Sequence, residues 1–415
     1  MISKIKVLFN NNKIVIENYF FMTFLQVLNS LFYLIIYPYL IRTLGVENYG
    51  LYVFATSISM YFVTFVAFGF EMPALNSIVL NQNNDKVKSY ILSCVFTAKI
   101  YLEVLSLIVF VLLITLIPFL NKNWIIFSIC FSNTLTGILF PTWYFQGIQN
   151  MRIVTLIQLS FKITSLIFIF IFVKSANDLC LFVLIVNSTN IGGAVVAFSI
   201  IQFVHKIKIQ FVVFSQLKKW FVDAMPFFWT VAAGTVKSQS ITLITGGFFS
   251  LSDVAIYDLA YKIISIPSTL LTSINSALFP KMNANLKTEK VRIILRYESL
   301  LGLLVIFFVV FFGKWIVILL GGEKMVSAYP MTIILSLTIY AWLVVGAYIN
   351  FVFIPNKLFY FITKNQSVAL LSFFVYFLLG FLFFKSVLVL VVALSMSALT
   401  EVLFCRFIVR KKQLL

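Results

Sequence analysis

The sequence predicts an all-α polytopic membrane protein with twelve transmembrane helices in two six-helix lobes. Of its 415 residues, 62% are apolar and only 11% are charged, whereas a soluble domain carries about 25% charged residues. The apolar residues gather in long runs bounded by polar breaks, and a helix needs about 20 such residues to cross the hydrocarbon core of a bilayer. We therefore expect a chain solvated by lipid, with no soluble domain beside its spans.

Twelve runs are long enough for a span. They cover residues 19–41, 49–70, 89–117, 124–147, 151–173, 179–204, 222–249, 254–280, 298–320, 329–354, 367–384 and 387–409. The first run is too long for the core of a signal peptide, and no small-residue cleavage site follows it, so it is predicted to remain as an uncleaved span. An even number of spans places both termini on one side of the membrane.

The distribution of lysine and arginine identifies that side. If the N-terminus is cytoplasmic, 21 of the 31 basic residues fall in cytoplasmic segments, six in outer segments and four within spans. Cytoplasmic loops of membrane proteins carry such an excess of basic residues. The net charge of +18 is explained in this way, both termini are predicted to be cytoplasmic, and we expect no nucleic acid as a partner.

The longest basic break divides the chain into two halves. It runs from His205 to Lys219, after the sixth expected span. The predicted N-terminal six-helix lobe covers residues 1–210, and the predicted C-terminal six-helix lobe covers residues 211–415.

A faint internal repeat supports this division. The stretch Gly45–Ala55 can be laid on Ser250–Ala260, so that Tyr52 matches Tyr257 and the two terminal alanines match. Both stretches open the second span of their half, as expected for parallel repeats of two lobes.

Four stretches are similar to segments of one family of membrane proteins. They are Pro38–Gly50, which contains Leu-Gly-x-x-x-Tyr-Gly; Pro141–Gly147, which reads Pro-Thr-Trp-Tyr-Phe-Gln-Gly; Ala255–Lys262; and Leu278–Lys281. In these segments, and in their order along essentially the whole chain, the sequence resembles the polysaccharide transporter family of the multidrug/oligosaccharidyl-lipid/polysaccharide (MOP) exporter superfamily. That family contains the Wzx-type O-antigen and repeat-unit flippases.

The resemblance implies a V-shaped pair of lobes that moves a polyprenyl-diphosphate-linked oligosaccharide across the bacterial inner membrane by alternating access. It implies the lipid bilayer and this lipid-linked oligosaccharide as partners. It leaves open whether H⁺ or Na⁺ drives transport and whether glycan polymerase or chain-length proteins dock on the inner loops. It does not fix the sugars of the substrate.

Charged residues within spans point to the path of such a substrate, because a lysine at mid-membrane costs from about 3 to over 10 kcal/mol. Lys162, Lys237 and Lys262 each lie on a polar helix face, and the three faces come from both lobes. Lysine offers a compact charge with rotatable donors, which suits a phosphate that slides. We predict that these three lysines bind the diphosphate and glycan of the substrate, in a cationic central cavity.

The faces are defined by steps of three and four residues. Lys162 shares its face with Thr155, Gln158 and Ser165; Lys237 with Thr230, Gly234, Ser238 and Thr245; and Lys262 with Asp258, Ser265, Thr269, Thr272 and Ser276.

Local pairing is the alternative for some of these charges. Asp258 precedes Lys262 by four residues, and Lys99 precedes Glu103 by four in the third span. Such spacing on a helix favours an ion pair. For Lys99 and Glu103 we favour a structural pair, with proton or sodium coupling through Glu103 as the rival interpretation. Asp258 is a second candidate for ion coupling.

Several chemistries are not indicated. The four cysteines, Cys94, Cys130, Cys180 and Cys405, are widely separated in or near apolar segments, so they suggest neither a disulfide framework nor a metal site. We expect no cofactor, no metal and no catalytic residue.

Two other functions remain as alternatives. A membrane-embedded glycan polymerase or glycosyltransferase would need longer outer loops than this chain has. A flippase for the lipid-linked peptidoglycan precursor is closer, although that branch usually has fourteen spans. A small-drug exporter would be expected to keep an acidic residue in its first span, and residues 19–41 contain none.

Overall fold

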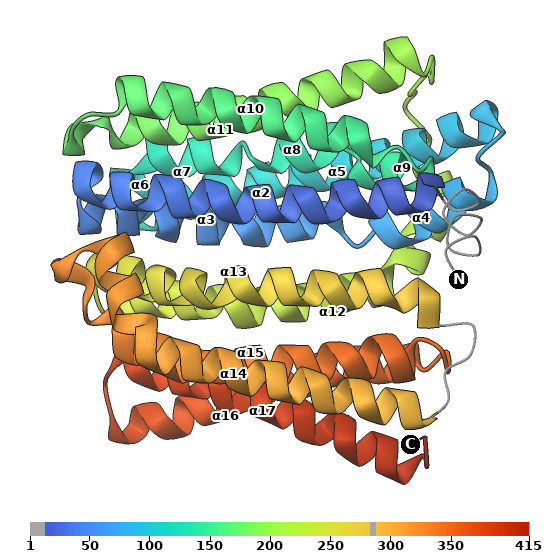
Figure 1. The fold of residues 1–415 in the computed structure, drawn as a ribbon. Coiled ribbons are helices and arrows are strands. Elements are labelled where there is room, and N and C mark those ends of the chain that lie inside the picture. The colour runs from blue at the N-terminus through green and yellow to red at the C-terminus, as the bar shows by residue number, and fades with distance from the viewer. Residues whose placement is uncertain (1–12, 283–287, 415) are drawn as a thin grey trace. The chain divides into compact units, whose positions relative to one another are not determined.

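The computed structural model describes residues 13–282 and 288–414, with side chains described for residues 17, 18, 20–271 and 289–414. Within these residues the chain is helical and contains no strand. The helices are α2 (Lys13–Leu44), α3 (Val46–Ala67), α4 (Glu71–Leu80), α5 (Asp85–Leu116), α6 (Pro118–Lys122), α7 (Trp124–Phe131), α8 (Thr134–Leu139), α9 (Thr142–Gly147), α10 (Met151–Phe172), α11 (Leu179–Ser199), α12 (Phe214–Phe248), α13 (Leu251–Met282), α14 (Thr288–Gly321), α15 (Ala328–Tyr348), α16 (Phe359–Phe383) and α17 (Val387–Lys411) (Figure 1).

The expected membrane spans are largely present. Eleven helical segments in the described part of the chain are long and apolar enough to cross a membrane, and each overlaps an expected span. The seventh expected span is also helical, as part of α12, but it is not one of the eleven because serine, threonine, glycine and lysine interrupt its apolar residues. The all-α polytopic fold class is therefore confirmed, while the count of twelve remains a prediction.

The chain forms two compact units. Unit 1 consists of residues 1–32 and 55–232, and unit 2 of residues 33–54 and 233–415. The C-terminal part of α2 and the N-terminal part of α3 thus belong to unit 2. The predicted lobes, residues 1–210 and 211–415, stay a prediction.

Unit 1 is built around a broken span. The fourth expected span consists of α7, α8 and α9, and α9 begins immediately after Pro141. The Pro-Thr-Trp-Tyr-Phe-Gln-Gly segment folds into α9, and its Trp143 and Phe145 are buried in the core of this unit. α9 packs closely on α4, because a Cβ atom at Gly147 would lie 2.6 Å from the Ile78 Cγ2 atom. This break matters for the site, since it leaves backbone groups of the helix without their usual partners.

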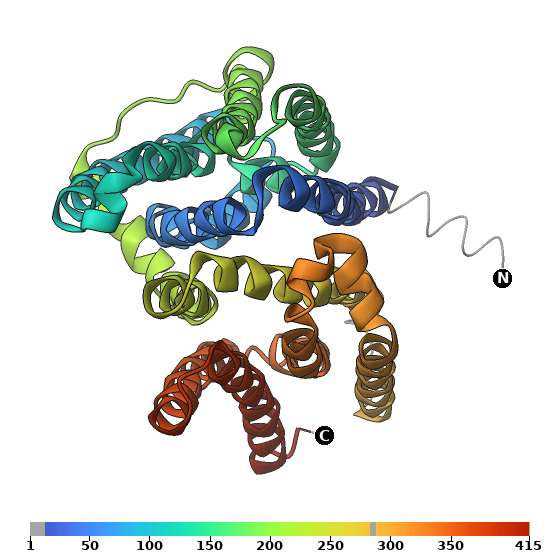
Figure 2. The ribbon, with the colours of Figure 1, turned by 90° about the vertical axis from the view of Figure 1, so that its left-hand side faces the viewer.

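In unit 2, α15 packs against α13, α14 and α17, and α16 packs against α17 (Figures 1 and 2). The ends of α2 and α3 join this unit through close helix contacts. A Cβ atom at Gly50 would lie 1.8 Å from the Leu251 carbonyl oxygen, and one at Gly246 would lie 2.3 Å from the Phe54 ring. Small residues allow helix backbones to approach this closely in membranes.

Candidate functional site

Lys162 of α10 lies beside a cavity inside unit 1. The cavity has a volume of about 220 Å³ and is bounded by α8, α10 and α11 and by residues next to them. Its lining residues are Asn133, Thr136, Phe140, Ile157, Gln158, Phe161, Lys162, Thr189, Asn190 and Gly193. The Lys162 ammonium also lies 5.1 Å from the centroid of the Phe32 ring, within the range of a cation–π contact.

Half of the residues that line this cavity carry neutral polar side chains. Among its ten described lining residues, Lys162 is the one cation, and no carboxylate occurs. The predicted face of α10 is only partly open to it: Gln158 lines the cavity, whereas the Thr155 hydroxyl donates to the Met151 and Phe21 carbonyls. Ser165, one turn beyond Lys162, is buried, and its hydroxyl has no hydrogen-bond partner in the described structure. Polar residues at membrane depth that surround a cavity mark a candidate substrate site.

The ion pair predicted between Lys99 and Glu103 on α5 is not formed. Lys99 Nζ donates to the Gly137 carbonyl over 2.8 Å, and Glu103 Oε1 accepts from the Thr134 hydroxyl over 2.6 Å. The reason lies in the broken fourth span. In a continuous helix the Gly137 carbonyl would accept from residue 141, but this residue is Pro141, which has no N–H. Lys99 satisfies that carbonyl instead.

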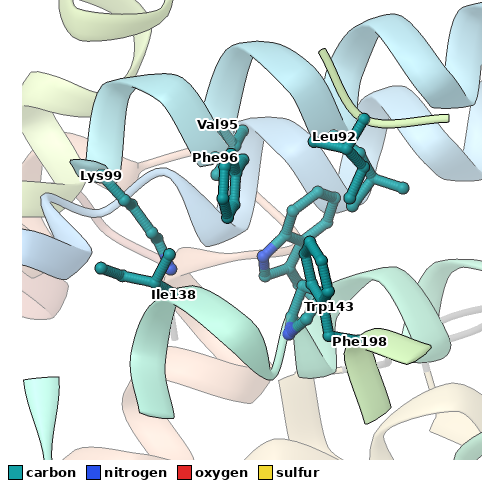
Figure 3. Close-up of a pocket in the computed structure, with 9 residues that line it drawn as sticks. Leu92, Val95, Phe96, Lys99, Ile138, Trp143 and Phe198 are labelled. Atoms are coloured by element: carbon teal, nitrogen blue, oxygen red, sulfur yellow. The ribbon is translucent and has the colours of Figure 1, made fainter. Parts of the chain in front are cut away.

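The surroundings of Lys99 leave no room for a ligand. The lysine is 2% exposed, and the adjoining pocket, which Trp143 and Ile138 also line, has a volume of only about 10 Å³ (Figure 3). That is about the space of one water molecule. Lys99 is therefore a structural residue in this conformation, while the coupling role suggested for Glu103 stays a prediction.

Lys237 of α12 is paired with a carboxylate that is distant in sequence. Lys237 Nζ lies 2.5 Å from Glu401 Oε1 of α17, and the pair is buried within unit 2. The Asn365 amide of α16 donates to Glu401 Oε2 over 3.3 Å, and the Cys405 thiol lies 3.7 Å from Asn365 Oδ1. A single buried network thus joins three helices of unit 2.

Lys262 of α13 lies in a cage of one carboxylate and three tyrosine rings. Its Nζ atom is 2.8 Å from Asp258 Oδ2, which also accepts from the Tyr49 hydroxyl over 2.8 Å. The ammonium is 4.7 Å from the ring centroid of Tyr33, 5.8 Å from that of Tyr49 and 5.9 Å from that of Tyr37. The pairing of Asp258 with Lys262, weighed from the sequence, is therefore present in the structure.

The predicted site residues are divided between the two units. Lys162 belongs to unit 1, whereas Lys237 and Lys262 belong to unit 2. On α13, Ser265 and Thr269 hydrogen-bond to carbonyls of their own helix. Thr272, Ser276 and the segment Leu278–Lys281 lie outside the residues with described side chains. Binding of substrate by the three lysines stays a prediction.

Sequence reasoning missed two polar residues of the site, Glu401 and Asn365. A signal was available for Glu401, because a carboxylate in the middle of an apolar span is costly and calls for a partner. Its partner lies 164 residues earlier in the chain, so helix spacing could not have supplied it.

The long apolar helices define the class of a multi-pass membrane protein. Solved structures of MOP superfamily transporters have this fold. The lipid II flippase MurJ in an inward closed conformation is 13% identical, with a TM-score of 0.68 over 95% of this chain and 86% of that chain. A multidrug resistance MATE family transporter in an inward-facing conformation is 10% identical, with a TM-score of 0.63 over 94% and 95% of the two chains.

The chain belongs to the polysaccharide biosynthesis protein family, which matches residues 15–286. A relative from Escherichia coli (strain K12), named "Putative O-antigen transporter", is 29% identical over 296 residues, or 70% of this chain and 71% of the relative. A relative of the same name from Shigella dysenteriae is 26% identical over 342 residues, or 76% of this chain and 83% of the relative. The predicted family is confirmed, and the chain shares its fold with solved structures of MOP superfamily transporters.

Proposed function

We propose that this protein moves polyprenyl-diphosphate-linked oligosaccharide repeat units, of the O-antigen or capsule type, from the cytoplasmic to the outer leaflet of the bacterial inner membrane. Transport occurs by alternating access: the two lobes, residues 1–210 and 211–415, rock about a cationic central cavity. The glycan and the diphosphate pass through the protein, while the prenyl tail stays in lipid. The protein acts as a transporter and not as an enzyme.

Two kinds of observation support the substrate class. The chain belongs to a family of polysaccharide biosynthesis proteins, and two relatives carry the name of an O-antigen transporter. The chemistry of the spans fits this class, because a diphosphate needs positive compensation in a low-dielectric region and the chain places lysines within its spans. Hydrogen bonds from an ammonium to phosphate are charge-assisted and therefore strong.

The observation that carries the proposal is the position of Lys162. It lines a cavity together with neutral polar side chains, which places a cation beside groups that can hydrogen-bond to a glycan. Lys237 and Lys262 lie against Glu401 and Asp258. They bind the diphosphate only in a state of the transport cycle in which those carboxylates release them, and such a release makes Asp258 a candidate for H⁺ or Na⁺ coupling.

The orientation follows from the basic residues. The inner loops and both termini carry most of the lysine and arginine, which places both ends of the chain in the cytoplasm. Glycan polymerase and chain-length proteins are proposed to dock on these inner loops.

The proposal is tested by complementation of a deletion strain at matched membrane abundance. Wild type should restore surface glycan, and Lys162→Met should lower it at least tenfold while lipid-linked repeat units accumulate on the cytoplasmic side. Lys174→Met is the matched control, because Lys174 is an exposed lysine just beyond α10 that donates to the Phe170 carbonyl at the end of that helix. It should restore glycan fully.

Two results would contradict the proposal. The first is that the wild-type protein restores no surface glycan in the strain whose own gene has been deleted. The second is that the lipid-linked units that accumulate in Lys162→Met are already accessible at the outer surface, because the lost step then follows translocation and a polymerase becomes the better assignment.

A further inference from the structure

The cavity beside Lys162 has the size of a small ligand. Its volume is about 220 Å³. Pockets for drug-sized molecules begin at about 300 Å³, so this cavity fits a single sugar ring better than an oligosaccharide. All of its lining residues belong to unit 1.

Two amides in the lining have unused hydrogen-bonding capacity. Within the described residues, the side chains of Gln158 and Asn190 form no hydrogen bond, although both line the cavity. Each amide offers two donors and an acceptor. The lining hydroxyls add acceptors: the Thr189 hydroxyl donates to carbonyls of its own helix over 2.8 and 3.0 Å, and its oxygen can still accept a bond. Neighbouring hydroxyls of a sugar each donate and accept hydrogen bonds, so they match a lining in which donors and acceptors lie side by side.

An aromatic ring forms an apolar wall next to these amides. Phe161 lines the cavity and packs on two consecutive glycines: a Cβ atom at Gly192 would lie 2.9 Å from its ring, and one at Gly193 would lie 3.3 Å from it. The glycines therefore hold the ring in place by leaving room for it. An apolar ring face beside a few convergent polar groups is the usual construction of a small-molecule site, and here it matches the C–H face of a sugar ring.

We propose that this cavity is a subsite for a sugar 1-phosphate group, namely the sugar of the lipid-linked oligosaccharide that adjoins the diphosphate. Gln158 and Asn190 bind the sugar hydroxyls, Phe161 packs against the ring, and Lys162 binds an oxygen of the attached phosphate. The choice of this sugar rests on the proposed function. That the cavity combines groups for a sugar ring with a lysine for a phosphate is argued from the cavity alone. Substrate selection thereby begins at the sugar nearest the lipid.

The test measures binding to the full-length protein in lipid nanodiscs by calorimetric titration. The probes are glucose 1-phosphate, N-acetylglucosamine 1-phosphate, free glucose and inorganic phosphate. At least one sugar 1-phosphate should bind at least tenfold more tightly than inorganic phosphate or free glucose. Lys162→Met should reduce its affinity to that of the free sugar, and Asn190→Leu should reduce it to that of inorganic phosphate.

A matched control is available on the same helix. Asn187 of α11 lies one turn before Asn190, is buried, and donates to the Val183 carbonyl of its own helix instead of lining the cavity. Asn187→Leu should leave the affinity for sugar 1-phosphate within twofold of wild type. Gln158→Glu keeps the site polar and adds a negative charge, so it should abolish binding of sugar 1-phosphate even if Asn190→Leu does not fold.

The proposal is overturned if neither sugar 1-phosphate binds, or if inorganic phosphate binds as tightly as they do, because the cavity is then at most an anion site. It is also overturned if Asn190→Leu and Gln158→Glu bind like wild type. Complementation separates this failure from failure of the proposed function: full surface glycan with both variants would remove the subsite and leave the flippase, whereas no glycan with wild type would remove the flippase.

Discussion

Units 1 and 2 keep charged side chains at membrane depth in different ways. In unit 2, Lys237 and Lys262 are each paired with a carboxylate, Glu401 and Asp258. In unit 1, Lys99 lies against the Gly137 carbonyl, and Lys162 lines a cavity without a carboxylate in its lining and lies over the Phe32 ring. Lys88, which is also buried, pairs with the exposed Asp85 at the start of α5, outside the expected third span.

The two arrangements have different consequences for stability. A buried ion pair holds two helices in one arrangement, and breaking it by removing one partner is costly because the other charge remains buried. The pair of Lys237 and Glu401 therefore holds helices of unit 2 together, whereas binding of a ligand by Lys162 stays a prediction.

The largest expected effect tests the pair in unit 2. Glu401→Leu leaves Lys237 buried without its carboxylate and should lower the free energy of unfolding by about 3–5 kcal/mol. The double variant Lys237→Met, Glu401→Leu removes both charges and should recover most of this loss. Thermal unfolding in detergent measures both. If the single variant were as stable as wild type, Glu401 would not be holding a buried charge.

A smaller loss of stability is expected when the hydrogen bond from Lys99 to the Gly137 carbonyl in unit 1 is removed. Lys99→Met leaves the Gly137 carbonyl buried without a donor, because Pro141 cannot supply one. The free energy of unfolding should fall by about 1–3 kcal/mol. Lys174→Met, at an exposed site, should change it by less than about 0.5 kcal/mol. Equal stability of the two variants would show that the Lys99 bond contributes nothing.

Lys162→Met should change the free energy of unfolding by less than about 1 kcal/mol, since methionine keeps the apolar stem of the side chain. Thermal unfolding beside the complementation assay would then show a stable protein with little transport. A loss of several kcal/mol would instead place Lys162 with Lys237 among the structural charges and remove the contrast between the units.

The smallest expected effect concerns His205 of unit 1, just beyond the sixth span. Burial, together with the Lys88 cation, lowers the pKa of His205 below its ordinary value, and its Nδ1 atom lies 2.9 Å from the Tyr144 hydroxyl. Because the unfolded chain takes up the proton more readily, this contribution to stability is present above pH 6.5 and is lost as pH falls through the folded pKa.

The measurement is the unfolding midpoint between pH 7.5 and 5.5, which should fall slightly for wild type. His205→Gln should show a weaker dependence on pH over the same range. An unchanged dependence would mean that other groups titrate in this window.

The sequence alone predicted much of this protein. Hydropathy and the basic residues located the spans, and helix spacing predicted the contact of Asp258 with Lys262. The segments Pro38–Gly50 and Pro141–Gly147 pointed to the family. These inferences succeed because each depends on residues that are close together in the chain, so that a window or a helical repeat contains the whole signal.

The tertiary structure decided the partners. Helix spacing predicted an ion pair for Lys99, but the break at Pro141 offered it the Gly137 carbonyl. Lys237 has no acid within a turn, yet packing of α12 against α17 brings Glu401 to it. The cavity of Lys162 likewise depends on residues from α8 and α11 as well as its own helix. Which group each charged side chain contacts is set by contacts between helices, and those contacts join residues that lie far apart in the chain.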